Sequence, residues 1–167
     1  RGKTGKIELV ETKFTLQDLI DKTIESIHYK LKANQIHLVT HFNYPELVVK
    51  ADKAKLMQVL RNVIDNAIKF SNKGAQLTIA DKKQEKNDLV ISISDSGKGM
   101  SVDEIVNAFD FPDSDREISG PYGVGLGLPL AKLFIEMLEG DIWIESEENI
   151  GTTIFIKIPK KRLFKKR

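Results

Sequence analysis

Two asparagines one helical turn apart, Asn62 and Asn66, are the residues of this chain whose type and spacing best suit a chemical role. Side chains four residues apart are neighbours on a helix, and Lys69 falls on the same side. Amide oxygens can ligate a hydrated cation, and an ammonium group can hold the phosphates bound to that cation. Taken alone, the same residues also fit the exposed side of an ordinary surface helix.

A turn that contains two glycines supplies a second candidate site. Asp95 ends an apolar run, and the segment that begins with it reads DSGKGM. A carboxylate at this position can accept a hydrogen bond from an exocyclic amino group such as that of adenine, and it would repel the oxygen that guanine presents at the same edge. The glycines let the backbone approach a flat ring closely. A common tight turn could have the same sequence.

Two further glycine segments follow. Residues 120–128 read GPYGVGLGL and precede an expected helix. Backbone N–H groups in such a loop, with the helix N-terminus behind them, can form a cradle for phosphate. The segment is neither a Walker loop nor G-x-G-x-x-G, because neither spacing is present. Gly151-Thr152-Thr153 lies between two expected strands and by itself predicts only a hairpin turn.

Hydrophobic periodicity predicts the elements that must position these residues. Helical spacing predicts helices over 15–34, over 52–71 with Asp52 as the cap, near 102–109 and over 127–138. Alternation predicts strands over 36–42, 76–81, 89–94, 141–146 and 152–158. Residues 111–122 have two prolines and little periodicity and are expected to form a mobile loop. Consecutive strands mixed with helices predict an α+β sandwich, not Rossmann-type alternation.

Several side chains are predicted to form the core between the helices and the sheet. They are Leu60, Val63, Ile64, Ile79, Ile91, Ile93, Leu133, Ile144 and Ile156. Trp143 alternates with Ile142 and Ile144 and is therefore expected on the outer face of the sheet, partly buried under the C-terminal tail.

Composition limits the classes of protein. The chain has 167 residues, which fit one domain. It has no cysteine, which excludes disulfides and thiolate metal sites. No apolar run reaches the roughly 18 residues that a transmembrane helix needs. Six basic residues lie within 160–167, and without them 20 basic residues face 24 acidic ones, a net charge of −4. Because a nucleic-acid-binding domain needs a basic face, no nucleic-acid partner is expected.

Taken in order, the segments NVIDNAIKFS, DSGKGM, GVGLGL and GTT closely resemble the motifs of the ATP-binding catalytic domain of sensor histidine kinases. Relatives of that domain include gyrase, heat-shock-90 and mismatch-repair ATPases. The resemblance implies a two-layer sandwich, with a mixed sheet of about five strands covered on one face by about three helices. It divides the chain into a linker over 1–8, an ATP-binding catalytic domain over 9–159 and a solvated basic tail over 160–167.

The resemblance also implies roles for individual residues. Asn66 would hold Mg²⁺, Asn62 would support the metal and the phosphates, and Lys69 would contact a phosphate, all three as catalytic residues. Asp95 would bind adenine, with Thr152 sharing an ordered water at the same edge. The remaining residues implied in ATP binding are Phe70, Gly97, Gly99, Met100, Gly123, Val124, Gly125, Leu126, Gly127 and Leu128.

The resulting hypothesis is a protein-histidine kinase domain that transfers the γ-phosphoryl group of ATP to a histidine on a separate dimerisation domain. Hydrolysing relatives are expected to carry a glutamate, as the base that activates water, where this chain has Asn62. An amide cannot take a proton at neutral pH. Asp65 points off the centre of the same helical face and is not nominated as a base. The three histidines, His28, His37 and His41, lack the context of a phospho-acceptor.

Two alternatives remain open. The phenylalanine segment, Phe109-Asp110-Phe111-Pro112, is compressed relative to the family pattern. It motivates a degenerate module that binds nucleotide or docks without phosphotransfer. A hydrolytic ATPase of the same superfamily is the other alternative. Phe109 or Phe111 is expected to pack the neighbouring loop against the core or against the missing dimerisation helices.

The resemblance implies partners and a location as well. The partners are ATP, the histidine-bearing dimerisation domain of the same protein and the receiver domain of a response regulator. The fragment itself is expected to be monomeric. Its expected location is the cytoplasm, within a parent protein that can be anchored in the inner membrane.

Overall fold

The computed structural model describes residues 8–112 and 126–165, and two sheets organise them. The larger sheet has the strand order β2-β4-β5-β7-β6, and the smaller has the order β1-β3-β8. The strands are β1 (Thr12–Thr15), β2 (His37–His41), β3 (Val48–Ala51), β4 (Gln76–Lys83), β5 (Leu89–Asp95), β6 (Asp141–Glu147), β7 (Gly151–Ile158) and β8 (Leu163–Phe164). The helices are α1 (Leu16–Ala33), α2 (Lys53–Phe70), α3 (Val102–Asn107) and α4 (Gly127–Met137), with 3₁₀ turns η1 (Glu85–Asn87) and η2 (Lys160–Arg162).

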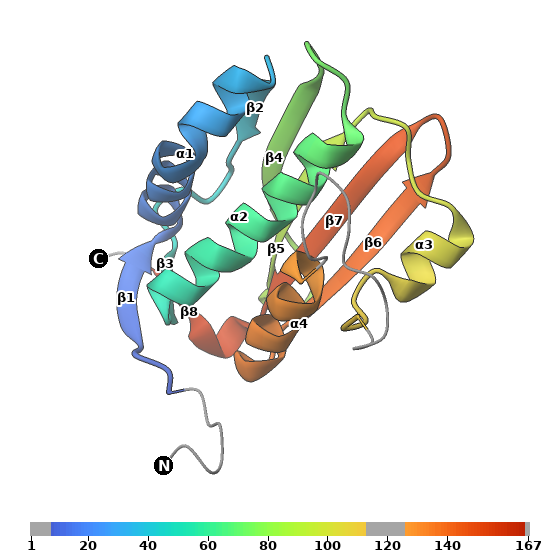
Figure 1. Cartoon of the computed structure of the whole chain (residues 1–167). Helices are drawn as coiled ribbons and strands as arrows, with labels where there is room; N and C mark the ends of the chain where they lie inside the picture. Colours follow the sequence, from blue (N-terminus) through green and yellow to red (C-terminus); the bar gives the residue numbers. More distant parts are fainter. Residues whose placement is uncertain (1–7, 113–125, 166–167) are drawn as a thin grey trace.

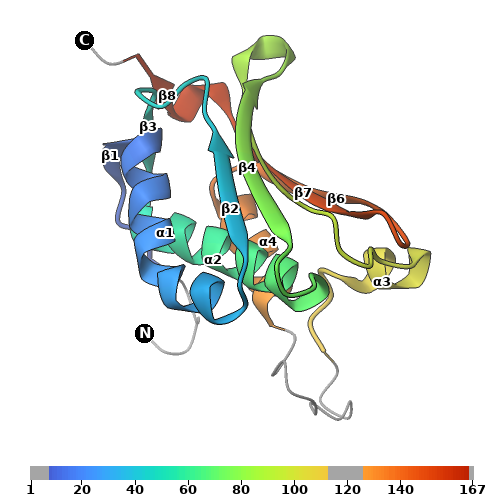
Figure 2. The same ribbon diagram turned by 90° about the horizontal axis from the view of Figure 1, so that it is seen from above.

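The large sheet and the helices form two layers. Helices α1, α2 and α4 lie over one face of the sheet (Figure 1). In the view from above, no helix of the described residues covers the other face (Figure 2). β2 runs parallel to β4, whereas the pairs β4–β5, β5–β7 and β6–β7 are antiparallel. The predicted α+β sandwich with a mixed five-stranded sheet under three helices is confirmed, and α3 is an additional short helix beside the sheet.

Side-chain caps determine where the two long helices begin. The Thr15 hydroxyl accepts a hydrogen bond from the Asp18 N–H at the start of α1. Asp52 caps α2 as predicted, because its Oδ1 accepts from the Lys55 N–H at 3.1 Å. Its Oδ2 accepts from the Val10 N–H at 2.9 Å. Asp52 therefore fixes both the first turn of α2 and the chain that enters the domain.

The core lies between the helices and the large sheet. One side of α2 is buried, and its fully enclosed residues are Leu56, Val59, Leu60, Val63 and Ile64, of which Leu60, Val63 and Ile64 were predicted core residues. Ile79, Ile91, Ile93 and Ile156 meet them from the sheet as predicted, and Ile144 is partly buried beside them. The prediction for Leu133 is wrong, since its side chain is exposed. The inner side of α4 is formed by Leu128, Ala131, Phe134 and Ile135.

The small sheet was not expected from the sequence, and it corrects the prediction for the basic tail. Leu163 pairs with Val49 and Phe164 with Val48, so this part of the tail is a strand of the domain and not a solvated terminus. Arg162 donates from Nε to the Leu138 carbonyl at 2.8 Å. Leu163 is partly buried against the core, which gives the charged segment an apolar anchor.

The remaining predictions concern Trp143, the loop over 111–122, the linker and membrane-spanning segments. Trp143 lies on the outer face of the sheet as predicted, where it stacks on Phe155 with ring centroids 5.2 Å apart. Most of the loop predicted over 111–122 falls outside the described residues, as do residues 1–7 of the expected linker. None of the helices in the described ranges has the length and apolar character required to cross a bilayer.

Candidate functional site

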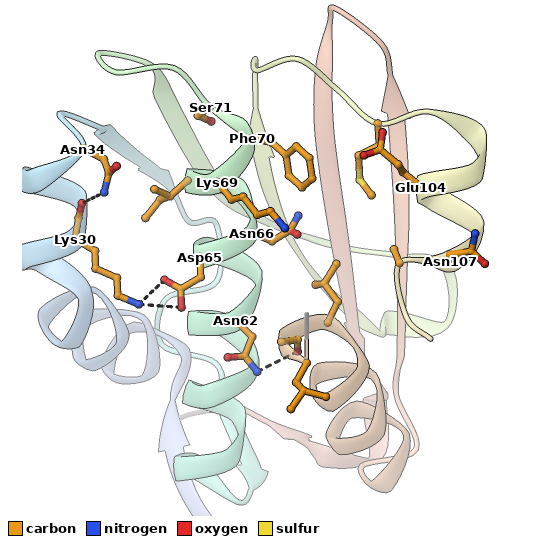
Figure 3. Close-up of a pocket in the computed structure, with 16 residues that line it drawn as sticks. Lys30, Asn34, Asn62, Asp65, Asn66, Lys69, Phe70, Ser71, Glu104 and Asn107 are labelled. Carbon is orange, nitrogen blue, oxygen red and sulfur yellow. Dashed lines mark hydrogen bonds and ion pairs between the residues drawn. The ribbon is translucent and has the colours of Figure 1, made fainter. Parts of the chain in front are cut away.

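A cavity of about 960 Å³ lies among α1, α2, α3 and the start of α4. Sites for small molecules commonly have volumes of about 300–1,000 Å³. The lining includes eight of the residues predicted to bind ATP, which are Asn62, Asn66, Lys69, Phe70, Met100, Leu126, Gly127 and Leu128. Figure 3 shows Asn66, Lys69 and Phe70 on one side of α2, whereas Asp65 points toward Lys30 on α1. Segments far apart in the sequence therefore meet in one cavity.

Asn66 has an unused hydrogen-bonding group in this cavity. Its Nδ2 atom is buried and has no hydrogen-bond partner among the residues that the structure describes. Buried polar groups are nearly always paired, so an orphaned amide nitrogen needs an explanation. A bound ligand supplies one: the amide can donate to a phosphate oxygen from Nδ2 and ligate a cation through Oδ1.

Asn62 connects α2 to the beginning of α4. Its Nδ2 donates to the Gly127 carbonyl at 3.0 Å (Figure 3). Gly127 is the first residue of α4 and the last glycine of the second glycine cluster. Asn62 therefore holds the end of that cluster against the asparagine helix. The other glycine-cluster residues predicted to bind phosphate, Gly123, Val124 and Gly125, lie outside the described residues.

Positive charge gathers at the C-terminal end of α2. Lys69 Nζ lies 5.4 Å from the centroid of the Phe70 ring, and Lys98 Nζ lies 4.9 Å from the same centroid. The Lys98 N–H also donates to the Phe70 carbonyl at 3.2 Å. Both ammonium groups interact favourably with the ring face, and both can attract an anionic ligand. Lys98 was not assigned a role from the sequence, although it stands between the two glycines of the DSGKGM segment.

Asp95 lies next to the cavity and is not among its lining residues. Its Oδ1 accepts from the Gly97 N–H at 2.9 Å. Gly97 packs directly on α2, because a Cβ added there would lie 2.1 Å from the Phe70 carbonyl oxygen. Burial raises the pKa of the Asp95 carboxyl, and hydrogen bonds from the Gly97 and Thr152 backbones oppose that rise. The carboxylate is therefore a poorly solvated acceptor beside the cavity.

The remaining predicted residues, Gly99 and Thr152, do not line the cavity. Thr152 is the register partner of Asp95 between β7 and β5 and is buried. Gly99 has φ +72°, and a Cβ there would lie 2.1 Å from the Glu147 carbonyl oxygen. Only glycine suits this close approach of two backbones. Ser146, which no sequence motif indicated, bonds to both Thr152 and the Met100 N–H.

An ion pair between α1 and α2 lies at the edge of the cavity. Lys30 Nζ donates to both carboxylate oxygens of Asp65, at 3.0 and 3.1 Å (Figure 3). Asp65 is held in this ion pair, which agrees with its omission from the candidate bases.

Two phenylalanines were expected to pack near the loop. Phe109 is partly buried against the core, and Phe111 is exposed.

The side chains near the cavity suit a cation that takes most of its ligands from water and from a bound substrate. Within residues 8–112 and 126–165, no group of three or more His, Cys, Asp or Glu side chains could hold a metal ion. Mg²⁺ is commonly bound through one or two protein groups, several waters and the phosphates of a substrate. Asn66 fits that mode of binding, because it lines the cavity and its side-chain oxygen is a ligand type that Mg²⁺ accepts. Its buried Nδ2, which has no partner among the described residues, can donate to a phosphate oxygen of the same ligand.

Comparison with known proteins identifies the family. The model of the family described as histidine kinase-, DNA gyrase B-, and HSP90-like ATPase matches residues 51–162. The sensor protein GacS of Pseudomonas syringae pv. syringae is 33% identical over 96% of this chain and 18% of its own length. The sensor histidine kinase WalK of Bacillus subtilis (strain 168) is 35% identical over 78% of this chain and 22% of its own length. The chain thus spans about a fifth of each of these relatives.

A solved structure extends the likeness to the whole domain. The nucleotide-free catalytic domain of the histidine kinase ThkA is 27% identical to this chain, with a TM-score of 0.76. The similarity covers 92% of this chain and 97% of the ThkA domain. The chain therefore belongs to the family of histidine kinase-, DNA gyrase B-, and HSP90-like ATPases, and it has the ATP-binding catalytic domain of the histidine kinase branch.

Proposed function

We propose that this domain binds ATP together with Mg²⁺ and transfers the γ-phosphoryl group to a histidine on a separate dimerisation domain of its parent protein. The observation that carries the proposal is the buried Asn66 Nδ2, which has no partner among the described residues and belongs to a side chain that lines a cavity of nucleotide size. Family membership supports ATP as the substrate.

The residues of the cavity would act mainly by positioning and by charge. Asn66 would hold Mg²⁺ through its side-chain oxygen, and Lys69 and Lys98 would attract the phosphates from the end of α2. Bound Mg²⁺ supplies neutralisation of the charge on the phosphates during transfer. Asn62 keeps the start of α4 close to α2 through its bond to Gly127, so that the phosphates and the asparagines would share one enclosed space.

Recognition of the base would fall to the neighbouring Asp95. A carboxylate only accepts hydrogen bonds when ionised, so it selects an exocyclic amino group and disfavours a carbonyl oxygen. Its position near Phe70, across Gly97, supports this role, because Phe70 lines the cavity.

The arrangement favours transfer to a histidine over hydrolysis. Hydrolysis needs a base that takes a proton from water, and residue 62 is an amide whose N–H₂ group donates to Gly127. The two carboxylates found among the described lining residues are both engaged. Asp65 is held by Lys30, and Glu104 accepts from the Ser101 N–H. The partners proposed with this activity are the dimerisation domain and a response regulator, and the proposed location is the cytoplasm.

Labelled ATP would test the proposal. The domain is incubated with γ-labelled ATP, Mg²⁺ and the part of the parent protein that carries the acceptor histidine. We expect acid-labile label on that partner, which is lost in Asn66→Ala. The control is Asn107→Ala, because Asn107 also lines the cavity but its amide donates to the Asp103 carbonyl of its own helix.

Each alternative gives a different result in the same assay. Binding of ATP without transfer to the partner would favour a docking module. Steady release of phosphate by the domain alone, abolished in Asn66→Ala, would favour a hydrolytic ATPase.

A further inference from the structure

Ser146 is the centre of a hydrogen-bond network that joins three separate segments. Its Oγ accepts from the Met100 N–H at 2.8 Å and donates to the Gly151 carbonyl at 2.9 Å. It also lies 2.7 Å from the Thr152 hydroxyl oxygen. Met100 is the last residue of the first glycine segment and lines the cavity, whereas Gly151 and Thr152 belong to the third glycine segment.

These bonds determine which way the Thr152 hydroxyl donates. A serine hydroxyl has one proton, and Ser146 uses it on the Gly151 carbonyl. Ser146 can therefore only accept from Thr152, so the Thr152 proton points toward Ser146. The Thr152 hydroxyl then has only lone pairs to offer on its other sides. Thr152 is 2% exposed, so bulk water cannot readily supply a replacement partner.

The orientation of Thr152 matters because of its neighbour across the sheet. Thr152 and Asp95 are register partners on β7 and β5, and alternation places both on the inner face with Ile93 and Ile154. With its proton directed to Ser146, Thr152 is an acceptor beside the carboxylate. A water held between two acceptors uses both of its protons on them and presents its oxygen outward. An amino group is favoured there, and the carbonyl oxygen of guanine is not.

We propose that Ser146 is a positioning residue that makes the site selective for adenine, by holding the Thr152 hydroxyl as an acceptor next to Asp95. This inference rests on the proposed nucleotide function. It adds a residue outside the glycine segments and a physical cause for discrimination against guanine. Without the Ser146 hydroxyl, Thr152 could rotate and donate its proton toward the base, which would accommodate a carbonyl oxygen.

The test compares the affinities for ATP and GTP in variants of the whole domain. We expect the wild type to prefer ATP, and we expect Ser146→Ala to reduce the ATP-to-GTP affinity ratio about tenfold, the effect of one hydrogen bond. Thr152→Val removes the hydroxyl with little change of shape and should reduce the ratio similarly. Because Ser146 acts through Thr152, the double variant should show no further reduction.

The same sheet offers a matched control. Ser94 and Thr153 form a second serine–threonine hydroxyl pair at 2.8 Å, between β5 and β7. It differs in facing the outer side of the sheet, as the alternation of these strands requires. Ser94→Ala should therefore leave the ATP-to-GTP ratio unchanged.

The outcomes separate this inference from the proposed function. An unchanged ratio in folded Ser146→Ala, or effects of Ser146→Ala and Thr152→Val that simply add, would overturn it. If Ser146→Ala does not fold, an unchanged ratio in Thr152→Val overturns it instead. Failure of the wild type to bind ATP at all would contradict the proposed function itself.

Discussion

Asp95 is a carboxylate whose ionised form the surrounding protein does not favour. Burial is the largest influence on it and raises its pKa, and the two backbone N–H donors only partly oppose this. A functional acceptor in a poorly solvated place is a common feature of binding sites. Burial of the ionised Asp95 carboxylate lowers the stability of the fold, whereas the same carboxylate supplies an acceptor for a ligand. These two effects can be measured separately.

Asp95→Asn should separate these two effects. The folded state holds the Asp95 proton more tightly than the unfolded state, so stability falls as the pH rises from the ordinary pKa of 3.8 through the raised value. The amide that replaces the carboxylate has no charge to desolvate. We therefore expect the melting temperature of the variant, relative to wild type, to rise between about pH 3 and pH 7. Its affinity for ATP should fall, since one acceptor becomes a donor. If the difference in melting temperature between Asp95→Asn and wild type does not change with pH over this range, the account of Asp95 is contradicted.

The sequence indicated eight of the 16 residues that line the cavity, because those eight belong to short motifs. Asn62 and Asn66 could be paired from helical spacing alone. Ser146 and Lys98 could not be assigned in the same way. The role of Ser146 depends on the register of β6 against β7, which places it opposite Thr152. The role of Lys98 depends on how the glycine turn packs on Phe70.

At the scale of elements, α2 is held at both ends by groups outside it. Asp52 caps its first turn and also accepts from Val10. At its other end, the Phe70 carbonyl accepts from Lys98. Since α2 carries Asn62, Asn66 and Lys69, the precision of the site depends on these two attachments.

Asp52→Ala should destabilise the domain at neutral pH by about 1–2 kcal/mol, the usual effect of losing a helix cap. Burial alone would raise the pKa of Asp52, but hydrogen bonds from the Val10 and Lys55 backbones and the Lys55 charge outweigh it and lower the pKa. A lowered pKa stabilises the fold above the ordinary value of 3.8, and this contribution is lost as the pH falls. The loss in Asp52→Ala, measured by urea unfolding, should therefore shrink in acid. If Asp52→Ala loses the same free energy of unfolding at neutral pH and in acid, the assignment of Asp52 as a charged cap is contradicted.

Two glycines at the site should respond differently to alanine. Gly97→Ala would place a Cβ 2.1 Å from the backbone oxygen of Phe70, and neither backbone can move without shifting Asp95 or α2. We expect a loss of thermal stability and of ATP binding. At Gly127 the added Cβ would meet Asn62 Cβ at 3.6 Å, an ordinary contact, and alanine favours a helix. Gly127→Ala should keep or gain stability. Equal melting temperatures for the two variants would argue against this difference in packing.

The long elements could be predicted because their periodicity is sustained. The apolar stripe of α2 and the alternation of β7 run over many residues. β1 and β3 have four residues each and β8 has two, which is too few for alternation to be distinctive. Their pairing depends on contacts between distant parts of the chain.

At the scale of the whole molecule, the small sheet joins segments from both ends of the described chain. Arg162 makes three of the connections. Its Nε donates to the Leu138 carbonyl at 2.8 Å, and its Nη1 donates to the Lys50 carbonyl at 3.0 Å and to the Glu11 carboxylate at 2.6 Å. Basic composition had suggested a solvated tail, yet one arginine of that tail contacts β3, the end of α4 and the entering chain.

Arg162→Ala should reduce the free energy of unfolding by about 2 kcal/mol, the size expected for hydrogen bonds to a charged group. Lys161→Ala is the control, because its ion pair with Glu139 is exposed and exposed pairs contribute little. Urea unfolding of the two variants would measure the difference. Equal, small losses would mean that residues 160–164 are not a stabilising part of the domain.

Calorimetric titration with ATP, in the presence and absence of Mg²⁺, tests the central claim most directly. That claim assigns the Asn66 amide, whose buried Nδ2 has no partner within residues 8–112 and 126–165, to a metal-bound nucleotide. In the wild type, we expect Mg²⁺ to strengthen ATP binding by at least about tenfold, and in Asn66→Ala we expect the two titrations to agree. Equal affinity of the wild type for ATP with and without Mg²⁺ would contradict the account.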